Sequence, residues 1–304
     1  MTLTMALLRF LVFPGLLFAV PAAWLFMWGE RKAVARMQRR IGPPLLQPMY
    51  DFVKLMGKRP PVRPGIQGTM LNLWPMIAIV SMVGAIVLLP VLPGSAGFAG
   101  DVILLVALLE MPSVCLILAG FTSGSLYGEI GSTREAVLSV SNNLVFLLAI
   151  TTIAVVEHTY RLADIAGAST NPGHWLGVIG ILICIPAKLH LNPFSTSSAE
   201  QEIYSGPLTE YAGPELAMWE LAHGLEWLAL TGLVATLILP RGGAWWFHAP
   251  MFVIVSFGLV LTLAAVAAAT ARLTLKRSIR FYWRWALVLT VLAVSSSLYM
   301  RLKS

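Results

Sequence analysis

The stretch DVILLVALLEMPSVCLILAGF at residues 101–121 decides the class of fold. At about 1.5 Å per residue, a helix of this length can cross a hydrocarbon core of about 30 Å. In lipid such a run must be helical, because a helix satisfies its backbone hydrogen bonds internally and the run lacks the strict alternation of a barrel strand. We therefore expect a transmembrane helix here, with the carboxyl group of Glu110 at its middle.

Similar apolar runs recur along the whole chain and predict an all-α polytopic membrane protein of about eight spans. The composition agrees, since 58% of the 304 residues are hydrophobic and 12% are charged, with a mean hydropathy of +0.79. The first run is not a removable signal peptide, because Arg9 interrupts it rather than preceding it. We expect one integral membrane domain over residues 1–304, with spans near 5–28, 72–92, 101–121, 136–156, 174–191, 215–239, 251–271 and 283–300.

The net charge of +7 is distributed unevenly between the connections. Basic residues gather in residues 29–68 and 272–284, whereas the connections at 93–100, 157–174 and 240–250 carry only Arg161 and Arg241. The positive-inside bias then makes the basic loops cytoplasmic and places both termini outside. The basic excess reports topology rather than nucleic-acid binding. The expected cytoplasmic loops are residues 29–71, 122–135, 192–214 and 272–282, each approximate at its ends.

The residue types that hold metals or catalyse hydrolysis do not form a recognisable pattern. Cys115 and Cys184 both lie inside predicted spans, and no CxxC pair or Cys/His cluster occurs. Glu220, His223 and Glu226 are spaced by three residues on one predicted helix, yet carboxylate-bridged metals need ligands from other helices. We expect no metal, no iron–sulfur cluster and no catalytic residue in this chain.

The first cytoplasmic loop contains a short amphipathic segment, because apolar side chains recur at helical spacing over residues 45–56. A helix of this kind lies in the plane of the membrane interface. A generic lipid-surface helix is one interpretation. Glu30 and Asp51 among the cations, together with the Gly-Pro-Pro turn at residues 42–44, favour a shaped docking surface instead.

Three motifs resemble those of the complex I subunit 1 family, the membrane subunit that anchors the peripheral arm of respiratory complex I. They are ERKAVARMQRRIGPPLLQPMYDFVKL at residues 30–55, GSTREA at 131–136 and PFSTSSAEQEIYSGPLTEYAG at 193–213. The resemblance covers nearly the whole chain. The segments GPLTEYAGPE (residues 206–215) and IGSTREAVL (residues 130–138) resemble the formate hydrogenlyase and hydrogenase-4 branch more closely. Members of this branch belong to group 4 NiFe hydrogenase complexes.

The resemblance implies an eight-helix anchor in a prokaryotic cytoplasmic membrane. It implies a hydrogenase-like large subunit and an iron–sulfur small subunit on the cytoplasmic side, antiporter-like subunits in the membrane, and clusters and a NiFe centre in those partners rather than in this chain. Quinone binding is not favoured. The residues implied in docking or coupling are Glu30, Arg31, Arg36, Gln38, Arg40, Gly42, Pro43, Gln47, Asp51, Lys54, Arg134, Glu135, Pro193, Phe194, Glu200, Glu202, Glu210, Tyr211 and Gly213.

The chain departs from the family pattern where relatives carry acids for proton transfer. Ser195, Ser198 and Asn143 stand at positions where relatives usually place carboxylates, and Lys188 reverses the sign of another. A hydroxyl or amide has no proton to exchange near neutral pH. We expect a weak or rerouted proton path, and we favour a Lys188 side chain that extends to the cytoplasmic interface. The remaining relay candidates within the spans are Glu110, Lys188, Glu220, His223 and Glu226.

We therefore expect a non-catalytic membrane anchor of a multisubunit redox complex of the hydrogenase type. Two alternatives stay open at this point. One is a quinone-site subunit of a complex like NADH–quinone oxidoreductase. The other is an ion or solute transport module whose redox partners are degenerate.

Overall fold

The computed structural model describes residues 9–59, 63, 65–91, 97–167, 169, 171–197, 200–240 and 245–303, and these residues form helices, turns and loops without a strand. Each predicted span overlaps a helix, and the first four residues of the span predicted at 5–28 lie outside the described residues. In chain order the elements are α2 (Leu16–Met37), α3 (Gln47–Met56), α4 (Ile66–Leu88), α5 (Asp101–Ser123), α6 (Leu126–Val156), α7 (Leu162–Ile165), α8 (Pro172–Lys188), α9 (Glu200–Ile203), η1 (Gly206–Leu208), α10 (Pro214–Ile238), α11 (Trp245–Ala269), α12 (Leu275–Phe281), η2 (Tyr282–Ala286, a π-helical turn) and α13 (Leu287–Lys303).

Six helices among the described residues are long and apolar enough to cross a membrane. They are α2, whose span extends back to Arg9, and α4, α5, α6, α10 and α11. The apolar helix α8 is shorter, at 17 residues. The all-helical class is therefore confirmed, whereas the number of spans and the side of each terminus stay predictions.

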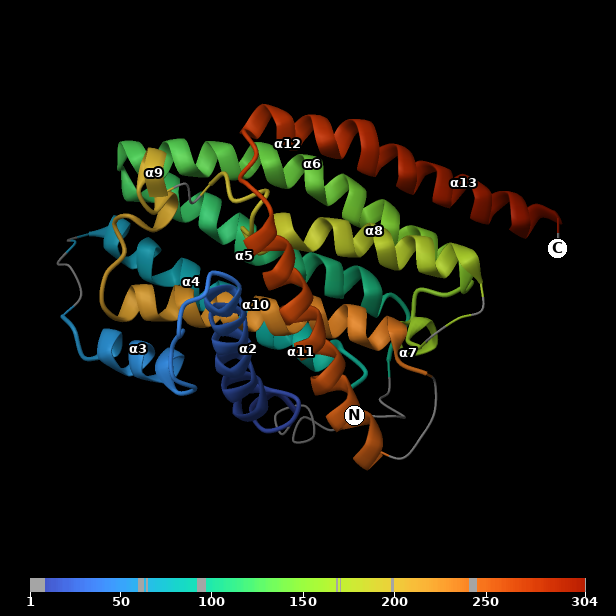
Figure 1. Ribbon diagram of the computed structural model, residues 1–304, viewed down its shortest axis with the longest axis horizontal. Helices are drawn as coiled ribbons and strands as arrows, with labels where there is room; N and C mark the ends of the chain where they lie inside the picture. Colours follow the sequence, from blue (N-terminus) through green and yellow to red (C-terminus); the bar gives the residue numbers. More distant parts are fainter. Residues whose placement is uncertain are drawn as a thin grey trace.

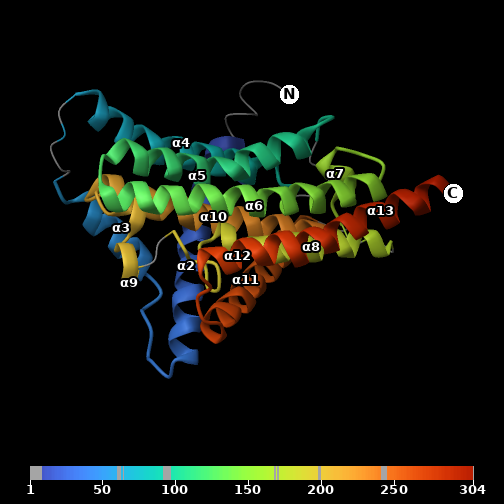
Figure 2. The same cartoon turned by 90° about the horizontal axis from the view of Figure 1, so that it is seen from above.

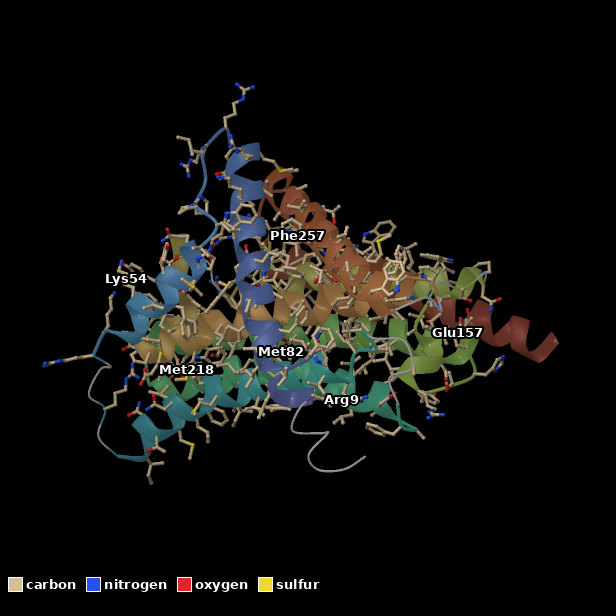
Figure 3. All side chains as sticks on the ribbon, turned by 90° about the horizontal axis from the view of Figure 1, so that it is seen from below. Arg9, Lys54, Met82, Glu157, Met218 and Phe257 are labelled. Carbon is tan, nitrogen blue, oxygen red and sulfur yellow. The ribbon has the colours of Figure 1, made fainter. Side chains whose placement is uncertain are left out.

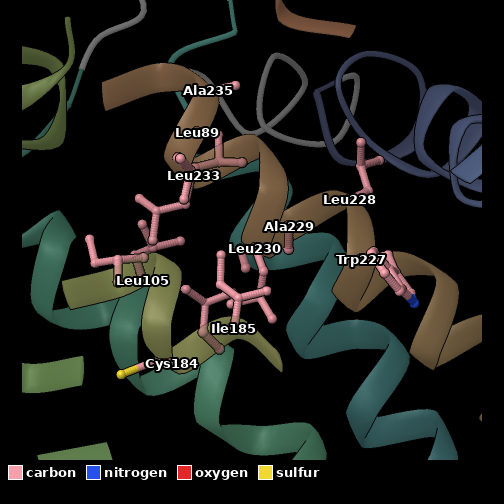
Figure 4. Close-up of a cluster of buried hydrophobic side chains, with 14 of the residues drawn as sticks. Leu89, Leu105, Cys184, Ile185, Trp227, Leu228, Ala229, Leu230, Leu233 and Ala235 are labelled. Carbon is pink, nitrogen blue, oxygen red and sulfur yellow. The ribbon is translucent and has the colours of Figure 1, made fainter. Parts of the chain in front are cut away.

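The helix α10 lies at the centre of the bundle. Of its most apolar 18-residue window 83% is buried, against 28% for α11, and it packs against α2, α4 and α11. Leu105 of α5, Ile185 of α8 and Leu230 of α10 belong to the buried cluster shown in Figure 4. The helix α10 is thus largely enclosed by the other helices.

The other long helices pack around α10 in two orientations, one set along the long axis of the molecule and one set across it (Figure 1). The helices α4, α5, α6, α8 and α13 run roughly along the long axis of the molecule, and α6 packs against α5, α8 and α13. The helices α2 and α11 pack against each other and cross that direction steeply, so that the end of α2 projects from the bundle (Figure 2). The first residues of the first motif, Glu30, Arg31 and Arg36, belong to this helix, and Gln47, Asp51 and Lys54 belong to α3.

Two helices begin earlier or end later than expected. The helix α6 starts at Leu126, ten residues before the predicted span, so most of the expected loop at 122–135 is helical. At 31 residues α6 is about 46 Å long, which exceeds the hydrocarbon core of about 30 Å. The helix α2 continues to Met37 and carries Glu30, Arg31 and Arg36 on a helix rather than on a loop.

Glycines allow the loop of residues 192–214, which contains Glu200, Glu202 and Glu210 and which we call the acidic loop, to pack closely on α6. A Cβ atom on Gly131 would lie 2.6 Å from Pro207 Cδ and 2.9 Å from Gly206 Cα, so any larger residue would displace η1. Gly206 itself has φ +56°, a left-handed conformation that favours glycine. These two residues explain why the second and third sequence motifs meet in space.

Candidate functional site

The carboxylate of Glu202 connects the acidic loop to α6 and to the segment after α11 through ion pairs. Glu202 Oε2 lies 2.6 Å from Arg134 Nη1 of α6, and Glu202 Oε1 lies 2.8 Å from Arg272 Nη2, which follows α11. The hydrogen bond from Arg134 and the two guanidinium charges hold the pKa of Glu202 below its ordinary value. We call Glu202, Arg134 and Arg272 the loop clamp. It joins three parts of the chain that the sequence keeps far apart.

Arg63, which belongs to none of the three motifs, makes a second connection to the acidic loop. Arg63 Nη1 donates a hydrogen bond of 2.7 Å to the buried Glu215 carboxylate, and its other Nη atom contacts the carbonyl oxygen of Glu210. The guanidinium carbon lies 5.8 Å from the ring centroid of Tyr211. Burial raises the pKa of the Tyr211 hydroxyl. Sequence reasoning missed this pair; the one signal in the sequence is the carboxylate of Glu215 directly after Gly213-Pro214, at the start of an apolar helix.

The first loop folds back on α2 at the predicted Gly-Pro-Pro turn. Gly42 has φ +74°, and the carbonyl oxygen of Pro43 accepts hydrogen bonds from Trp28 Nε1 and Lys32 Nζ, both at 3.3 Å. Asp51 lies 3.1 Å from Arg31 Nη1 and accepts a hydrogen bond of 2.8 Å from Gln47. The turn and α3 are therefore tied to α2 by polar contacts.

The predicted amphipathic segment is a helix, α3, but only some of its apolar side chains are packed against the rest of the protein. Phe52 packs against Trp24 at a ring-centroid distance of 5.8 Å, whereas Val53 and Met56 are exposed. Its position at a membrane interface stays a prediction.

Most cations of the first loop are exposed. The exposed members have no ion-pair partner among the described residues, and we call them the basic patch: Arg36, Arg39, Arg40, Lys54, Lys58 and Arg59. Lys54 of α3 lies at the opposite end of the molecule from Glu157 (Figure 3). Unpaired guanidinium and ammonium groups on a protruding surface attract a partner of opposite charge.

Lys188 does not extend to the interface as expected. Its side chain is 2% exposed, and its ammonium group contacts Glu110 of α5 and donates a hydrogen bond of 3.1 Å to Asn143 Oδ1 of α6. The ammonium nitrogen also lies 4.5 Å from the centroid of the Phe146 ring. The expectation of a snorkelling side chain was wrong, because Glu110 provides the internal counter-ion that a desolvated ammonium group requires.

Two histidines and one carboxylate line a cavity of about 270 Å³. Glu30 of α2, His190 after α8, Ser197 of the acidic loop and His223 of α10 line it. Glu135 of α6 lies behind His190, with its Oε2 atom 3.1 Å from His190 Nε2. The lining also includes apolar side chains of Leu116, Leu189, Leu191, Leu208, Pro207 and Trp227, together with Ser205.

The predicted site residues therefore separate into groups. Glu30, Glu135, His223 and Glu226 gather near the cavity, whereas Glu110 and Lys188 form their own pair. Phe194 is buried against Phe281 and Tyr282 and has a packing role, and Gly213 begins α10 with φ +59°. The Glu200 side chain and residue Ser198 lie outside the described part of the chain. His190 was missed, because a single histidine beside the end of a span carries no motif.

The family model for NADH dehydrogenase matches residues 10–297. The chain belongs to this family. Hydrogenase-4 component C of Escherichia coli K12 is 32% identical over 229 residues, which is 72% of both chains. An NADH-quinone oxidoreductase subunit from Methylococcus capsulatus is 28% identical over 289 residues, 90% of both chains.

A solved relative shares the same arrangement of helices. The chain superposes on a chain of the membrane-bound sulfane sulfur reductase, an archaeal respiratory membrane complex, with a TM-score of 0.84 and 27% identity. The match covers 92% of this chain and 96% of that one. This member of the NADH dehydrogenase family is thus a membrane subunit of the complex I and hydrogenase-4 type.

Proposed function

We propose that this subunit anchors a hydrogenase-like large subunit and an iron–sulfur small subunit to the cytoplasmic face of a prokaryotic inner membrane. The partners would carry the clusters and the NiFe chemistry. Antiporter-like subunits would lie beside it within the bilayer. The subunit is not itself catalytic, and its role in proton or ion translocation would depend on the few ionisable groups left in the bundle.

The observation that carries this proposal is a difference between two sets of charged side chains: carboxylates that form ion pairs within the chain, and exposed cations that do not. Glu202 and Glu215 are both paired inside the chain by arginines, whereas the basic patch keeps its charges unpaired among the described residues. A surface whose acids are neutralised internally presents net positive charge. It suits a permanent partner with an acidic docking surface.

The test is to change the sign of the patch without changing the fold. In the intact complex, R36E/R39E/R40E should release the iron–sulfur small subunit during purification through a tag on this chain. The matched control R36K/R39K/R40K keeps the charge and should retain the partner. Equal retention in both variants at low and high salt would contradict the anchor role.

A quinone-site subunit is the second candidate, and the cavity beside Glu30 is the observation that favours it. At about 270 Å³ the cavity lies slightly below the usual range of about 300–1,000 Å³ for ligand sites. Organic extraction of the purified complex followed by quinone analysis separates the two candidates. A quinone present in stoichiometric amount and lost in the L116W variant would favour the quinone-site subunit. No feature of the described residues favours the transport module.

A further inference from the structure

The segment between α11 and α13 combines cations and aromatic rings without a carboxylate. Its sequence is RLTLKRSIRFYWRWA at residues 272–286, and no Asp or Glu follows Glu226 in the chain. The segment forms α12 and η2. It follows α11, which is long and apolar enough to cross a membrane, and it leads directly into the apolar residues of α13. A segment in this position is expected at the boundary between hydrocarbon and water.

The inner face of this segment is held by protein. Ser278, Tyr282 and Ala286 recur every four residues and are all buried. The Tyr282 hydroxyl donates a hydrogen bond of 3.2 Å to the carbonyl oxygen of Ile183 in α8, and its ring centroid lies 5.0 Å from that of Phe194. Both α12 and η2 pack against α6 (Figure 1). Because the inner face is fixed, the outer face keeps one orientation toward its surroundings.

The outer face carries four exposed cations that have no ion-pair partner among the described residues. We call them the α12 cations: Lys276, Arg277, Arg280 and Arg284. Arg272 differs from them, because it is paired with Glu202 in the loop clamp. The four positions extend over about 12 Å of helix at about 1.5 Å per residue. They therefore form one continuous cationic surface.

Exposed aromatic and apolar side chains continue this surface toward α13. Trp283 and Trp285 are 51% and 71% exposed, and Trp283 Nε1 donates a hydrogen bond of 3.2 Å to Ser141 Oγ of α6. Val288 and Leu292 of α13 are exposed as well. Tryptophan is enriched at the interface between lipid and water, where its ring contacts both. Along the chain the surface thus changes from cationic, through aromatic, to apolar.

We propose that α12 and the start of α13 bind an anionic phospholipid, with its phosphate against the α12 cations and its acyl chains along the exposed apolar side chains of α13. Guanidinium groups donate paired hydrogen bonds to phosphate oxygens. Basic surfaces beside a transmembrane helix attract anionic headgroups, whereas a zwitterionic headgroup brings a positive charge of its own toward the cations. An acidic soluble protein would match the cations but would leave Val288 and Leu292 uncovered. The phospholipid matches both halves of the surface.

The basic patch of the first loop provides a matched control for this proposal. Arg36, Arg39, Arg40 and Lys58 are also exposed and have no ion-pair partner among the described residues. They belong to α2 and to the segments after α2 and α3, and the end of α2 projects from the bundle (Figure 2). Removal of four charges from either surface changes the net charge of the chain by the same amount. A difference between the two variants therefore reports the position of the charges.

The test measures the lipid preference of the full chain in vesicles. Nitroxide-labelled phosphatidylglycerol or phosphatidylcholine is added to phosphatidylcholine vesicles that contain the chain, and electron paramagnetic resonance gives the fraction of label immobilised by protein. The inference does not depend on the proposed soluble partners. Because none of them is present in the vesicles, failed docking cannot change the result.

We expect the unchanged chain to immobilise phosphatidylglycerol several-fold more than phosphatidylcholine. R284Q should weaken this preference by up to about fivefold, and K276Q/R277Q/R280Q/R284Q should remove most of it. The control R36Q/R39Q/R40Q/K58Q should keep most of it, as should K276R/R277K/R280K/R284K, which preserves the charge. Equal immobilisation of the two lipids by the unchanged chain, or equal losses in the two charge-removing variants, would overturn the proposal.

A second measurement needs no change to the cations. Phosphatidylglycerol with brominated acyl chains quenches the fluorescence of a neighbouring tryptophan, and the difference between the unchanged chain and W285F isolates the signal of Trp285. This signal should be quenched more by brominated phosphatidylglycerol than by brominated phosphatidylcholine at the same mole fraction. Equal quenching by the two lipids would contradict a preference for the anionic headgroup. A Trp285 signal quenched by neither lipid would contradict the lipid contact and favour a soluble acidic partner.

Discussion

The ammonium group of Lys188 lies where the resemblance leads one to expect a carboxylate. It meets Glu110, which is 78 residues earlier in the chain, and Asn143. A buried charge without a partner is costly, whereas a well-formed pair roughly balances its own desolvation. The substitution therefore converts a row of acids into a closed ion pair. The ammonium group contacts one oxygen of the Glu110 carboxylate, whereas the other oxygen, Oε2, is buried without a hydrogen-bond partner among the described residues.

Removal of one partner from this pair should destabilise the bundle more than removal of both. We expect K188M to lower the free energy of unfolding by about 3–5 kcal/mol, because Glu110 stays buried without a counter-ion. The double variant K188M/E110L should recover most of that loss. Thermal unfolding of the complex in detergent measures both. A double variant as unstable as K188M would show that the pair is not a unit.

Between elements, the loop clamp decides whether the acidic loop is a fixed surface. Glu202 joins α9 to α6 and to the segment after α11, although its side chain is half exposed. Exposed ion pairs contribute little to global stability. What the clamp controls is the position of one loop. Gly131 and Gly206 assist by letting η1 approach α6 closely.

The clamp should open in acid. The folded pKa of Glu202 is below its ordinary value of about 4.5, so the clamp is complete above that value and weakens as pH falls through the lower folded pKa. The protection factor of the backbone amides in residues 200–209, which corrects for the intrinsic pH dependence of exchange, should be high from pH 7 to 5 and should decrease below about pH 4.5. In the E202Q variant the protection factors of these amides should be lower at every pH and should no longer depend on pH.

The exposed carboxylate of Glu129 offers the matched control, because it lies on α6 without a contact to Arg134 or Arg272 among the described residues. E129Q should retain the exchange profile of the unchanged chain. If E202Q retains it as well, the loop is held by packing alone.

At the scale of the whole molecule, the distribution of charge predicts the orientation in the membrane. The basic patch and the loop clamp both belong to connections expected in the cytoplasm, and Arg161 belongs to the opposite side. Moving several arginines across a bilayer is unfavourable, which is the basis of the positive-inside bias. The orientation in turn decides which face meets the soluble partners.

Cysteine labelling in intact cells tests that orientation. Starting from a C115A/C184A background, R40C should react with an impermeant maleimide after the cells are opened, and T159C should react before. The native cysteines are both buried, at 1% and 0% exposure, so they are poorly accessible to the maleimide, and the C115A/C184A chain without an added cysteine serves as the unlabelled control. Labelling of R40C in intact cells would invert the topology and remove the proposed cytoplasmic partners.

The sequence by itself determined the helical class, the place of each long helix and the family motifs. These are local properties, because in lipid each segment must satisfy its own backbone hydrogen bonds and so reveals itself by its length and apolarity. The tertiary structure decided which ionisable groups meet. Glu110 with Lys188, Arg63 with Glu215, and His190 with Glu135 come from distant helices and loops. Their pairing depends on helix packing, and the order of residues along a chain does not contain those distances.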